Sequence, residues 1–413
     1  MTTIDLLKKT KAAWGSIRSA NAEEKNRLLL AMAESLEANQ ADILRENQKD
    51  MDAARGSISD VMLDRLALTQ ARIHAMSDGI REAAELPDHV GRALAQFTRP
   101  NGMTITKRQV PLGLVAIIYE SRPNVTSDAA ALCIKSGNVC MLRSGKEAHR
   151  SACAIVKALK SGIAQGGGDP EILNIVDDIT HQSATDIMTA KGLVDLLIPR
   201  GGAGLIRAVA KEASVPVIRT GEGVCHIYID DEADLDMGAS ILFNAKCSRP
   251  SVCNAVECVL VHRDVAADFW KKALPLLDEK GVELRADPEA LEILGTRAVP
   301  AEDSDWDAEY DDYILAVKTA GGMDEAIDFI NAHGTQHSEA IITKNYFKAQ
   351  HFLDHVDAAA VYVNASTRFT DGGEFGLGAE IGISTQKMHA RGPMGLEELT
   401  SCKYVIYGEG QVR

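Results

Sequence analysis

The sequence predicts an α/β protein with two domains, each built on a parallel β-sheet. From residue 114 onward, short apolar stretches of strand length alternate with amphipathic stretches of helix length. This alternation is typical of parallel sheets that are covered by helices on both faces. The chain also has 413 residues, which is more than one hydrophobic core usually serves.

Composition argues against two classes of partner. The chain carries 44 Lys and Arg against 59 Asp and Glu, a formal net charge of -15, whereas nucleic-acid binding relies on surplus positive charge. The longest apolar runs, such as residues 114–118, are too short to span a membrane. The first 15 residues lack the apolar core of a signal peptide. We therefore expect a cytoplasmic protein that contacts neither nucleic acid nor membrane.

The eight cysteines contain no CxxC pair, so we expect no metal site. Without an export signal they are expected to be reduced thiols. Most of them are expected to be structural or surface residues. Cys253 raises a separate question, because it lies in a loop just before a predicted strand rather than inside the strand.

The first hundred residues are predicted to be mainly helical. Apolar residues within 29–36 recur at i, i+3, i+4 and i+7, which places them on one face of a helix. Asn21 and Glu24 resemble a capped start to this helix. Gly56 breaks the pattern, and a helix is expected to resume over residues 60–86.

Strand and helix units follow in two series. In the first series we expect strands at residues 103–109, 114–119, 138–143, 172–176, 194–199 and 215–219. The second series begins near residue 224, with helices at 235–247 and 265–277 and strands at 255–262, 313–318, 340–343, 359–364 and, in the tail, 404–407. Ligands of parallel sheets bind where the carboxyl ends of strands meet helix N-termini.

Two turns at the carboxyl ends of predicted strands combine cations with small residues. Residues 200–204, Arg-Gly-Gly-Ala-Gly, open a predicted helix, where glycines would let a phosphate approach free N–H groups. Residues 143–146, Arg-Ser-Gly-Lys, follow an earlier strand and would also suit a phosphate. The first turn is equally consistent with an ordinary strand-to-helix turn. The second is slightly better explained as a solvated helix start.

Polar residues follow two further predicted strands. Asn124 ends the run Ser-Arg-Pro-Asn after the strand at 114–119, and residues 364–369, Asn-Ala-Ser-Thr-Arg-Phe, follow the strand at 359–364. Taken alone, each run is typical of a turn. Several strand ends that carry small polar residues and arginines indicate a binding site more strongly than any one of them.

These segments resemble the aldehyde dehydrogenase superfamily, from about residue 5 to residue 408. PLGLVAIIYESRPN is similar to the segment that ends in the oxyanion-hole asparagine, which falls on Asn124. LRSGKEA is similar to the segment of the adenosine-binding lysine, whose column holds Arg143. HIYIDDEADLD is similar to the strand and acidic turn that open the catalytic domain. The superfamily nucleophile precedes the His of an LLVH strand by nine residues, so it maps onto Cys253, with His262 in the strand.

Three longer segments resemble one reductase subfamily specifically: SRPSVCNA, HGTQHSEAIIT and HARGPMGLEELTS. The resemblance implies an aldehyde dehydrogenase-like fold with two Rossmann-like domains and a small β element for oligomerisation. It assigns the NADP-binding domain to residues 1–100 and 112–223 and the catalytic domain to residues 224–365. Residues 101–111 and 386–413 would be the oligomerisation arm and tail. Edge strands of this kind usually pair with another subunit, so we expect a dimer or tetramer.

The resemblance implies an activity, NADPH-dependent reduction of L-glutamyl 5-phosphate to L-glutamate 5-semialdehyde in proline biosynthesis. Cys253 would form a thioester, and Asn124 would help to hold the oxyanion. The expected cofactor-binding residues are Arg143, Ser144, Gly145, Lys146, Arg200, Gly201, Gly202 and Glu309. The expected substrate-binding residues are Arg122, Arg249, Ser366 and Arg368. Glutamate 5-kinase, which would supply the substrate, is expected as a transient partner.

A free cysteine is only a few per cent thiolate at neutral pH, so some group must lower the pKa of Cys253. Arg249 and a nearby helix N-terminus are the candidates.

One position departs from the hydrolytic members of the superfamily, which carry a glutamate base just before a Gly-Gly pair. That column holds Thr220, and Glu222 lies two positions away. Because hydrolysis needs a base to activate water against a thioester, its absence favours acyl-phosphate chemistry. A hydrolytic NAD(P)-dependent semialdehyde dehydrogenase stays open if Glu222 fills the column. A non-catalytic scaffold or thiol redox sensor would need none of Cys253, Asn124 and Glu309.

Overall fold

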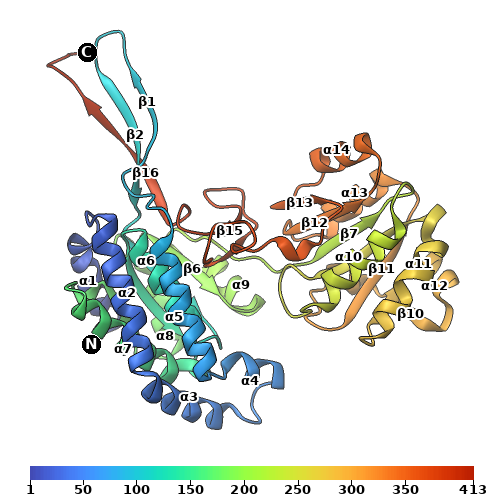
Figure 1. The fold of residues 1–413 in the computed structure, drawn as a ribbon, viewed down its shortest axis with the longest axis horizontal. Coiled ribbons are helices and arrows are strands. Elements are labelled where there is room, and N and C mark those ends of the chain that lie inside the picture. The colour runs from blue at the N-terminus through green and yellow to red at the C-terminus, as the bar shows by residue number, and fades with distance from the viewer. The chain divides into compact units, whose positions relative to one another are not determined.

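The computed structural model describes the backbone of residues 1–413 and all side chains except those of residues 60, 61 and 203. The chain divides into two units (Figure 1). Unit 1 consists of Met1–Thr220, Gly376–Gly382 and Met394–Arg413. Unit 2 consists of Gly221–Phe375 and Ile383–Pro393. Among the described residues, no helix is both long and apolar enough to cross a membrane.

Unit 1 is built on a four-stranded parallel sheet in the order β5-β4-β3-β6. Its strands are β3 (Leu114–Tyr119), β4 (Val139–Ser144), β5 (Leu173–Ile175) and β6 (Leu196–Arg200). Every residue of β3 is buried, as expected for a central strand with both faces covered. The four strands confirm the sequence prediction to within about two residues at each end.

In the described backbone of unit 1, nine α-helices accompany this sheet: α1 (Thr3–Ala12), α2 (Ala22–Ala38), α3 (Gln40–Ala54), α4 (Asp60–Leu66), α5 (Gln70–Glu85), α6 (Val125–Lys135), α7 (His149–Gln165), α8 (His181–Thr189) and α9 (Ala203–Glu212). α2 packs against both α5 and α7. It begins at the predicted capping box of Asn21 and Glu24. The prediction of one helix over residues 60–86 is wrong, because the helix ends at Leu66 and a second one is capped by Thr69.

The strand predicted over residues 215–219 is also wrong. This segment forms one isolated bridge to β6, between Val217 and Leu197. The Leu197 N–H donates to the Pro216 carbonyl at 2.9 Å, and the Ile218 N–H donates to the Leu197 carbonyl at 3.1 Å. Pro216 has no N–H to donate, and a proline is poorly tolerated within a sheet ladder.

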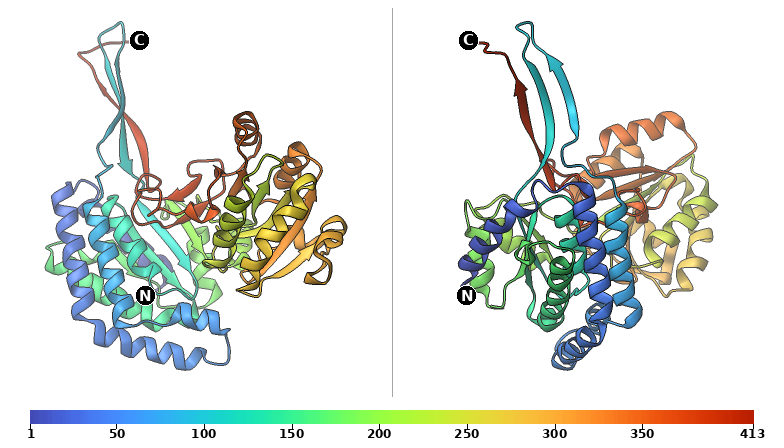
Figure 2. Two further views of the ribbon diagram at one scale, coloured as in Figure 1. Left: turned by 45° about the vertical axis from the view of Figure 1, so that its right-hand side comes forward. Right: turned by 60° about the vertical axis from the view of Figure 1, so that its left-hand side comes forward.

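An antiparallel sheet of three strands projects from unit 1 as an arm (Figures 1 and 2). Its order is β1 (Ala93–Thr98), β2 (Thr104–Pro111) and β16 (Thr400–Tyr407). The pairing of β2 with β16 joins the predicted arm to the predicted tail strand. β1 is exposed along its whole length, so it lacks the alternating pattern of a half-buried strand, and it was not predicted.

Unit 2 contains a seven-stranded sheet in the order β10-β9-β11-β8-β7-β12-β13, in which all pairs are parallel. The strands are β7 (Cys225–Ile229), β8 (Val256–His262), β9 (Glu283–Ala286), β10 (Ala298–Pro300), β11 (Ile314–Ala320), β12 (Ser338–Ile342) and β13 (Ala360–Val363). The helices are α10 (Leu235–Cys247), α11 (Arg263–Asp278), α12 (Pro288–Leu294), α13 (Met323–His333) and α14 (Tyr346–His355).

α10 has the bounds that the sequence predicted, because Asp234 caps its N-terminus by accepting the Met237 N–H at 3.2 Å. One layer of the core is formed around Phe269 and Trp270 of α11, which are both buried. β14 (Gly382–Ser384) and β15 (Gly392–Met394) form a separate two-stranded sheet where the chain passes between its units.

Candidate active site

Cys253 lies in the loop between α10 and β8, at the amino end of a buried strand. Gly223 precedes β7 and His337 precedes β12, the strand on the other side of β7. Because these strands are parallel, the three residues lie at the same edge of the sheet. The predicted nucleophile of unit 2 is therefore at the amino edge, and loops rather than helix N-termini surround it.

The backbone of Cys253 is closely packed. The Cys225 Sγ–H donates to the Cys253 carbonyl oxygen at 3.2 Å. A Cβ atom on Gly223 would lie 1.6 Å from the same oxygen, so no other residue fits at this position. The Gly223 N–H in turn donates to Glu309 Oε1 at 2.9 Å. Glu309 is predicted to hold the cofactor. The structure links it to the Cys253 backbone through a single residue, Gly223.

Asn254, the next residue, joins this loop to the turn after β13. Its buried side chain donates from Nδ2 to the carbonyls of Arg368, at 3.2 Å, and Thr370, at 3.0 Å. The Thr367 hydroxyl donates to the Asn254 carbonyl at 2.7 Å. The Arg368 guanidinium donates to Asn254 Oδ1. Asn254 has no signal in the sequence, because an asparagine in a turn is too common to stand out.

Three of the predicted substrate-binding residues belong to the same part of unit 2. Arg368 Nε donates to Ser248 Oγ at 3.1 Å. Ser366 is buried, and its hydroxyl accepts the Arg368 N–H at 3.3 Å at the start of the short 3-10 helix Thr367–Phe369. Desolvation and the neighbouring Arg249 both lower the pKa of Arg368. Two neighbouring cations form a place where an anion would be stabilised.

A chain of buried polar groups lies beneath the Cys253 loop. His337 Nδ1 is 2.8 Å from Ser338 Oγ and 3.7 Å from Cys225 Sγ. The Ser338 hydroxyl is 2.6 Å from Thr370 Oγ1. Burial lowers the pKa of His337 to about 4, so the imidazole is neutral near pH 7. The polar groups beneath the Cys253 loop are therefore joined by hydrogen bonds between uncharged side chains.

The predicted cofactor residues of unit 1 lie at the carboxyl ends of its strands, whereas Cys253 lies at the amino edge of the unit 2 sheet. β6 pairs with β3 on the side opposite β4, so the strand order reverses between β3 and β6, where doubly wound sheets bind ligands. Glu120 follows β3 directly and accepts the Gly202 N–H at 2.8 Å. A Cβ atom on Gly201 would lie 2.5 Å from Glu120 Oε2. A phosphate could reach the Gly202 amide only by displacing Glu120, which the sequence analysis missed.

The turn after β4 contains the other predicted cofactor residues. Arg143 Nη2 donates to the carbonyls of Ile179 and Thr180 at 2.9 and 3.1 Å. Ser144 Oγ is 3.2 Å from His149 Nδ1, and Gly145 packs against the backbone of Glu120. The Lys146 side chain is 76% exposed. The two turns fit a dinucleotide, since Lys146 offers a cation for a phosphate and Glu120 a carboxylate for ribose hydroxyls.

Asn124 and Arg122 come together in the turn before α6, where both are exposed. Asn124 Nδ2 donates to Asp128 Oδ2 at 3.2 Å. Desolvation raises the pKa of Asp128 to about 6. The predicted residues thus fall into two sets. Unit 1 holds Arg122, Asn124 and the cofactor residues up to Gly202; unit 2 holds Arg249, Cys253, Glu309, Ser366 and Arg368.

Comparisons with known proteins decide the family. A family model described as the aldehyde dehydrogenase family matches residues 3–289. The chain is 57% identical to gamma-glutamyl phosphate reductase of Neisseria meningitidis serogroup A, over 98% of this chain and 97% of that protein. It is 58% identical to gamma-glutamyl phosphate reductase of Streptococcus suis over the full length of both. The chain belongs to the aldehyde dehydrogenase family, among its gamma-glutamyl phosphate reductases.

Solved structures agree with this family at two levels. The crystal structure of gamma-glutamyl phosphate reductase from Thermotoga maritima matches with a TM-score of 0.97 and 42% identity, over 100% of both chains. An acetylating aldehyde dehydrogenase from Geobacillus thermoglucosidasius matches with a TM-score of 0.71 at 16% identity, which shows a shared fold. The predicted aldehyde dehydrogenase-like fold is confirmed. Aldehyde dehydrogenases use nicotinamide cofactors, so this chain is an oxidoreductase.

Thr220 is the residue that the family resemblance aligns with the base of hydrolytic aldehyde dehydrogenases. Its side chain is buried and donates from Oγ1 to the Pro199 carbonyl at 2.9 Å. A neutral threonine hydroxyl is too weak a base to take a proton from water. Glu222, the other residue considered for this role, is exposed.

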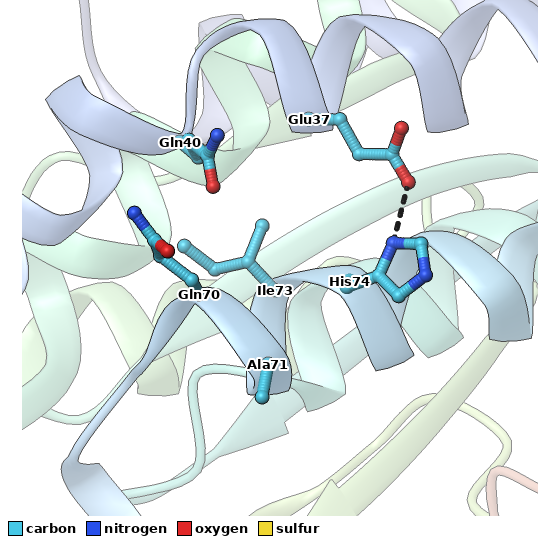
Figure 3. Close-up of a pocket in the computed structure, with 6 residues that line it drawn as sticks. All are labelled: Glu37, Gln40, Gln70, Ala71, Ile73 and His74. Carbon is cyan, nitrogen blue, oxygen red and sulfur yellow. Dashed lines mark hydrogen bonds and ion pairs between the residues drawn. The ribbon is translucent and has the colours of Figure 1, made fainter.

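A surface pocket of about 380 Å³ lies between α2 and α5 in unit 1, apart from every predicted site residue (Figure 3). His74 Nδ1 is 3.0 Å from Glu37 Oε1 at its rim.

Among the described residues, donor groups close enough to share a metal ion occur at three places: Glu37, His74 and Asp78 beside this pocket; His149, Cys153 and Asp177; Asp230, Asp231 and Glu232. Arg81 already bridges Glu37 and Asp78, and Lys348 pairs with Asp230 and its neighbours. The expectation of no metal stays a prediction.

Proposed function

We propose that this chain reduces L-glutamyl 5-phosphate to L-glutamate 5-semialdehyde, with NADPH as the hydride donor and release of phosphate. Its relatives are named gamma-glutamyl phosphate reductase, and we assign the reaction to the reductive step of proline biosynthesis. The observation that carries the proposal is the position of Arg368 and Arg249 beside the Cys253 loop. A nucleophilic thiol next to two cations suits a substrate whose leaving group is an anion.

The mechanism starts with attack of the Cys253 thiolate on the acyl carbon. The Asn124 amide and the Cys253 N–H hold the developing oxyanion, and one such donor is typically worth about 3–4 kcal/mol. Phosphate leaves as the thioester forms. When bound, the reduced nicotinamide supplies the hydride that takes the thioester to the aldehyde level. Cys253 is then the leaving thiolate as the hemithioacetal collapses. Thr220 cannot activate water, so the thioester would exchange with phosphate instead of being hydrolysed.

Substrate and cofactor contacts complete the proposal. Arg122, Arg249, Ser366 and Arg368 would bind the substrate phosphate and α-carboxylate. Arg143, Ser144, Gly145, Lys146, Arg200, Gly201, Gly202 and Glu309 would bind the cofactor. The exposed Lys146 cation favours NADPH over NADH, because only NADPH carries a ribose 2′-phosphate. We assign cofactor binding to residues 1–100 and 112–223 and catalysis to residues 224–365.

We further propose that residues 101–111 and 386–413 contribute to a homodimer or homotetramer in the cytoplasm. The exposed apolar side chains of the arm support this: Leu94, Phe97, Tyr404, Ile406 and Tyr407. A transient contact with glutamate 5-kinase would protect the labile acyl phosphate. Ile406→Lys should lower the mass measured by light scattering, and an unchanged mass would speak against pairing through the arm.

The reverse reaction tests the proposed function most directly. Glutamate semialdehyde and NADP would be supplied with and without phosphate, and NADPH formation would be followed by absorbance. We expect formation that depends strictly on phosphate. Cys253→Ala should abolish it and leave NADPH binding intact, whereas Cys402→Ala, a change at an exposed cysteine of the arm, should have no effect.

Two outcomes would overturn the proposal. NADPH formation without phosphate would mean that water accepts the acyl group, which is the hydrolytic alternative. Retained activity in Cys253→Ala would remove the nucleophile from the mechanism. Failure to bind any nicotinamide cofactor would instead favour a scaffold with this fold.

A further inference from the structure

The thiolate of Cys253 has an unfavourable helix neighbour. α10 ends at Cys247, and Ser248 is its C-cap, so the helix presents its C-terminal end to the loop that holds Cys253. The C-terminus of a helix carries partial negative charge, which destabilises an anion. The helix that precedes Cys253 therefore cannot lower its pKa, so α10 does not supply the expected helix N-terminus. A cation has to supply the stabilisation.

Two nearby cations are poorly suited to this role. Lys246 is buried, but its Nζ is 2.6 Å from Glu257 Oε2, so its charge is already compensated. Arg249 is exposed, so water and salt screen its charge. Arg368 differs from both, because it is partly buried and two side chains, Ser248 and Asn254, fix its guanidinium. A fixed, partly desolvated charge acts on a neighbour more strongly than an exposed one.

Asn254 determines where this guanidinium lies. Its Oδ1 accepts from Arg368, while its Nδ2 donates to the Arg368 and Thr370 carbonyls. The Thr367 hydroxyl also donates to the Asn254 carbonyl, so a further hydrogen bond joins the Cys253 loop to the turn after β13. Since Asn254 is also bonded covalently to Cys253, the distance between the guanidinium and the cysteine is set through a single side chain.

We infer that Asn254 is a positioning residue that holds Arg368 against the Cys253 loop, and that Arg368 is the cation that stabilises the Cys253 thiolate. This inference rests on the proposed function only in taking Cys253 as the nucleophile. It gives Arg368 a task before the substrate arrives, in addition to its proposed contact with the substrate.

Other charged groups face this junction and bear on its titration. Arg249, Asp371 and Glu374 act on Arg368. Cys225 contacts the Cys253 carbonyl, and His337 lies behind Cys225. Burial keeps both groups uncharged near neutral pH, because it lowers the pKa of His337 and raises that of Cys225. Glu309 reaches the loop through the Gly223 amide, and its carboxylate opposes the thiolate, which adds to the need for a fixed cation.

The test is the pH dependence of Cys253 alkylation by iodoacetamide in the full chain, without substrate or cofactor. Peptide mass spectrometry would assign the label to Cys253. We expect Asn254→Ala and Arg368→Gln each to raise the midpoint of the rate profile by about one pH unit. Alkylation near neutral pH should fall about tenfold, while the plateau at high pH stays unchanged. Arg368→Lys should restore part of the shift.

A matched control is Arg391→Gln, which removes another arginine of unit 2 that pairs with Asp357. Its midpoint should equal that of the unmodified chain. Arg368→Gln changes a partly exposed side chain, so it keeps the test informative if Asn254→Ala fails to fold. Because neither substrate nor cofactor is present, a wrong substrate assignment would leave these midpoints unaffected.

Three results would overturn the inference. The first is an unchanged midpoint in Arg368→Gln. The second is a shift in Arg249→Gln with none in Arg368→Gln, which would transfer the role to Arg249. The third is a lower plateau without a change in midpoint in Asn254→Ala, which would show that Asn254 only keeps the loop accessible.

Discussion

The candidate residues of the two units lie at opposite edges of their parallel sheets. In unit 1 they follow the strands β3, β4 and β6, where helices begin and backbone N–H groups point outward. In unit 2, Arg249 and Cys253 precede β8 and Glu309 precedes β11, at the edge where helices end and backbone carbonyls predominate. Arg368 follows β13, and its hydrogen bond to Asn254 holds it beside the same loop. The carboxyl edge has backbone N–H groups that can donate to a ligand. The amino edge has mainly carbonyls, so donors and cations there have to come from side chains.

The two edges also differ in what packs against their glycine turns. The turn at Gly201 packs against the carboxylate of Glu120, the end of a flexible side chain. The turn at Gly223 packs against the backbone of Cys253. A side chain can rotate away from an added atom, whereas a backbone cannot, so the amino edge of unit 2 should tolerate change less well.

The largest expected effect comes from adding one methyl group at each edge. Gly223→Ala should reduce kcat/KM at least about 100-fold, because the Cys253 loop has to move by an ångström or more. It should also lower the free energy of unfolding by about 3 kcal/mol. Gly201→Ala should cost about 1 kcal/mol or less, since Glu120 can adopt another rotamer.

Steady-state kinetics and urea unfolding of both variants would check this pair. Hydrogen exchange read by mass spectrometry would show which unit is affected, since peptides of each unit report separately. Equal losses in the two variants would contradict the difference between the edges. A near-normal Gly223→Ala enzyme would mean that the loop has room that the structure does not show.

The second prediction concerns the buried imidazole at the amino edge. Burial lowers the pKa of His337 from 6.5 to about 4, so only the unfolded chain takes up this proton as the pH falls through that window. The stabilisation is complete above about pH 6.5 and is lost by about pH 4, a loss of about 3 kcal/mol. His337→Gln removes the titration and should flatten the pH dependence of unit 2.

Urea unfolding at several pH values, with exchange in unit 2 peptides, would measure this effect. The control is His333→Gln, which changes a less buried histidine that pairs with Asp307 in the same unit. An unchanged slope in His337→Gln between pH 6.5 and 4 would refute the assignment. It would show that the proton is taken up by another group.

Parts of both edges could be predicted from the sequence, and the reasons are specific. The strand Leu114–Tyr119 and the helix Leu235–Cys247 were predicted with their bounds, because one is a continuous apolar run and the other follows an N-cap. Glu120 and Asn254 could not be predicted. Their roles depend on Gly202 and Arg368, which are 82 and 114 residues away in the chain, and no local pattern marks such a contact.

The smallest expected effect lies at the carboxyl edge and has the opposite sign to that of His337. Desolvation raises the pKa of Asp128 from 3.8 to about 6. Its stabilisation of unit 1 is complete below about pH 3.8 and is lost as the pH rises through 6. Asp128→Asn should therefore raise the free energy of unfolding at pH 7 by about 1 kcal/mol, less than the full shift implies because Asp128 is only partly buried.

The gain should disappear near pH 4, where Asp128 is largely protonated, and it should be confined to unit 1 peptides in hydrogen exchange. The asparagine carbonyl can still accept the Asn124 amide, so the turn before α6 should keep its shape. A loss of stability at pH 7 would mean that the charged carboxylate is needed to hold Asn124. Both edges would then depend on a side chain that positions a predicted catalytic residue, Asp128 for Asn124 and Asn254 for the loop of Cys253.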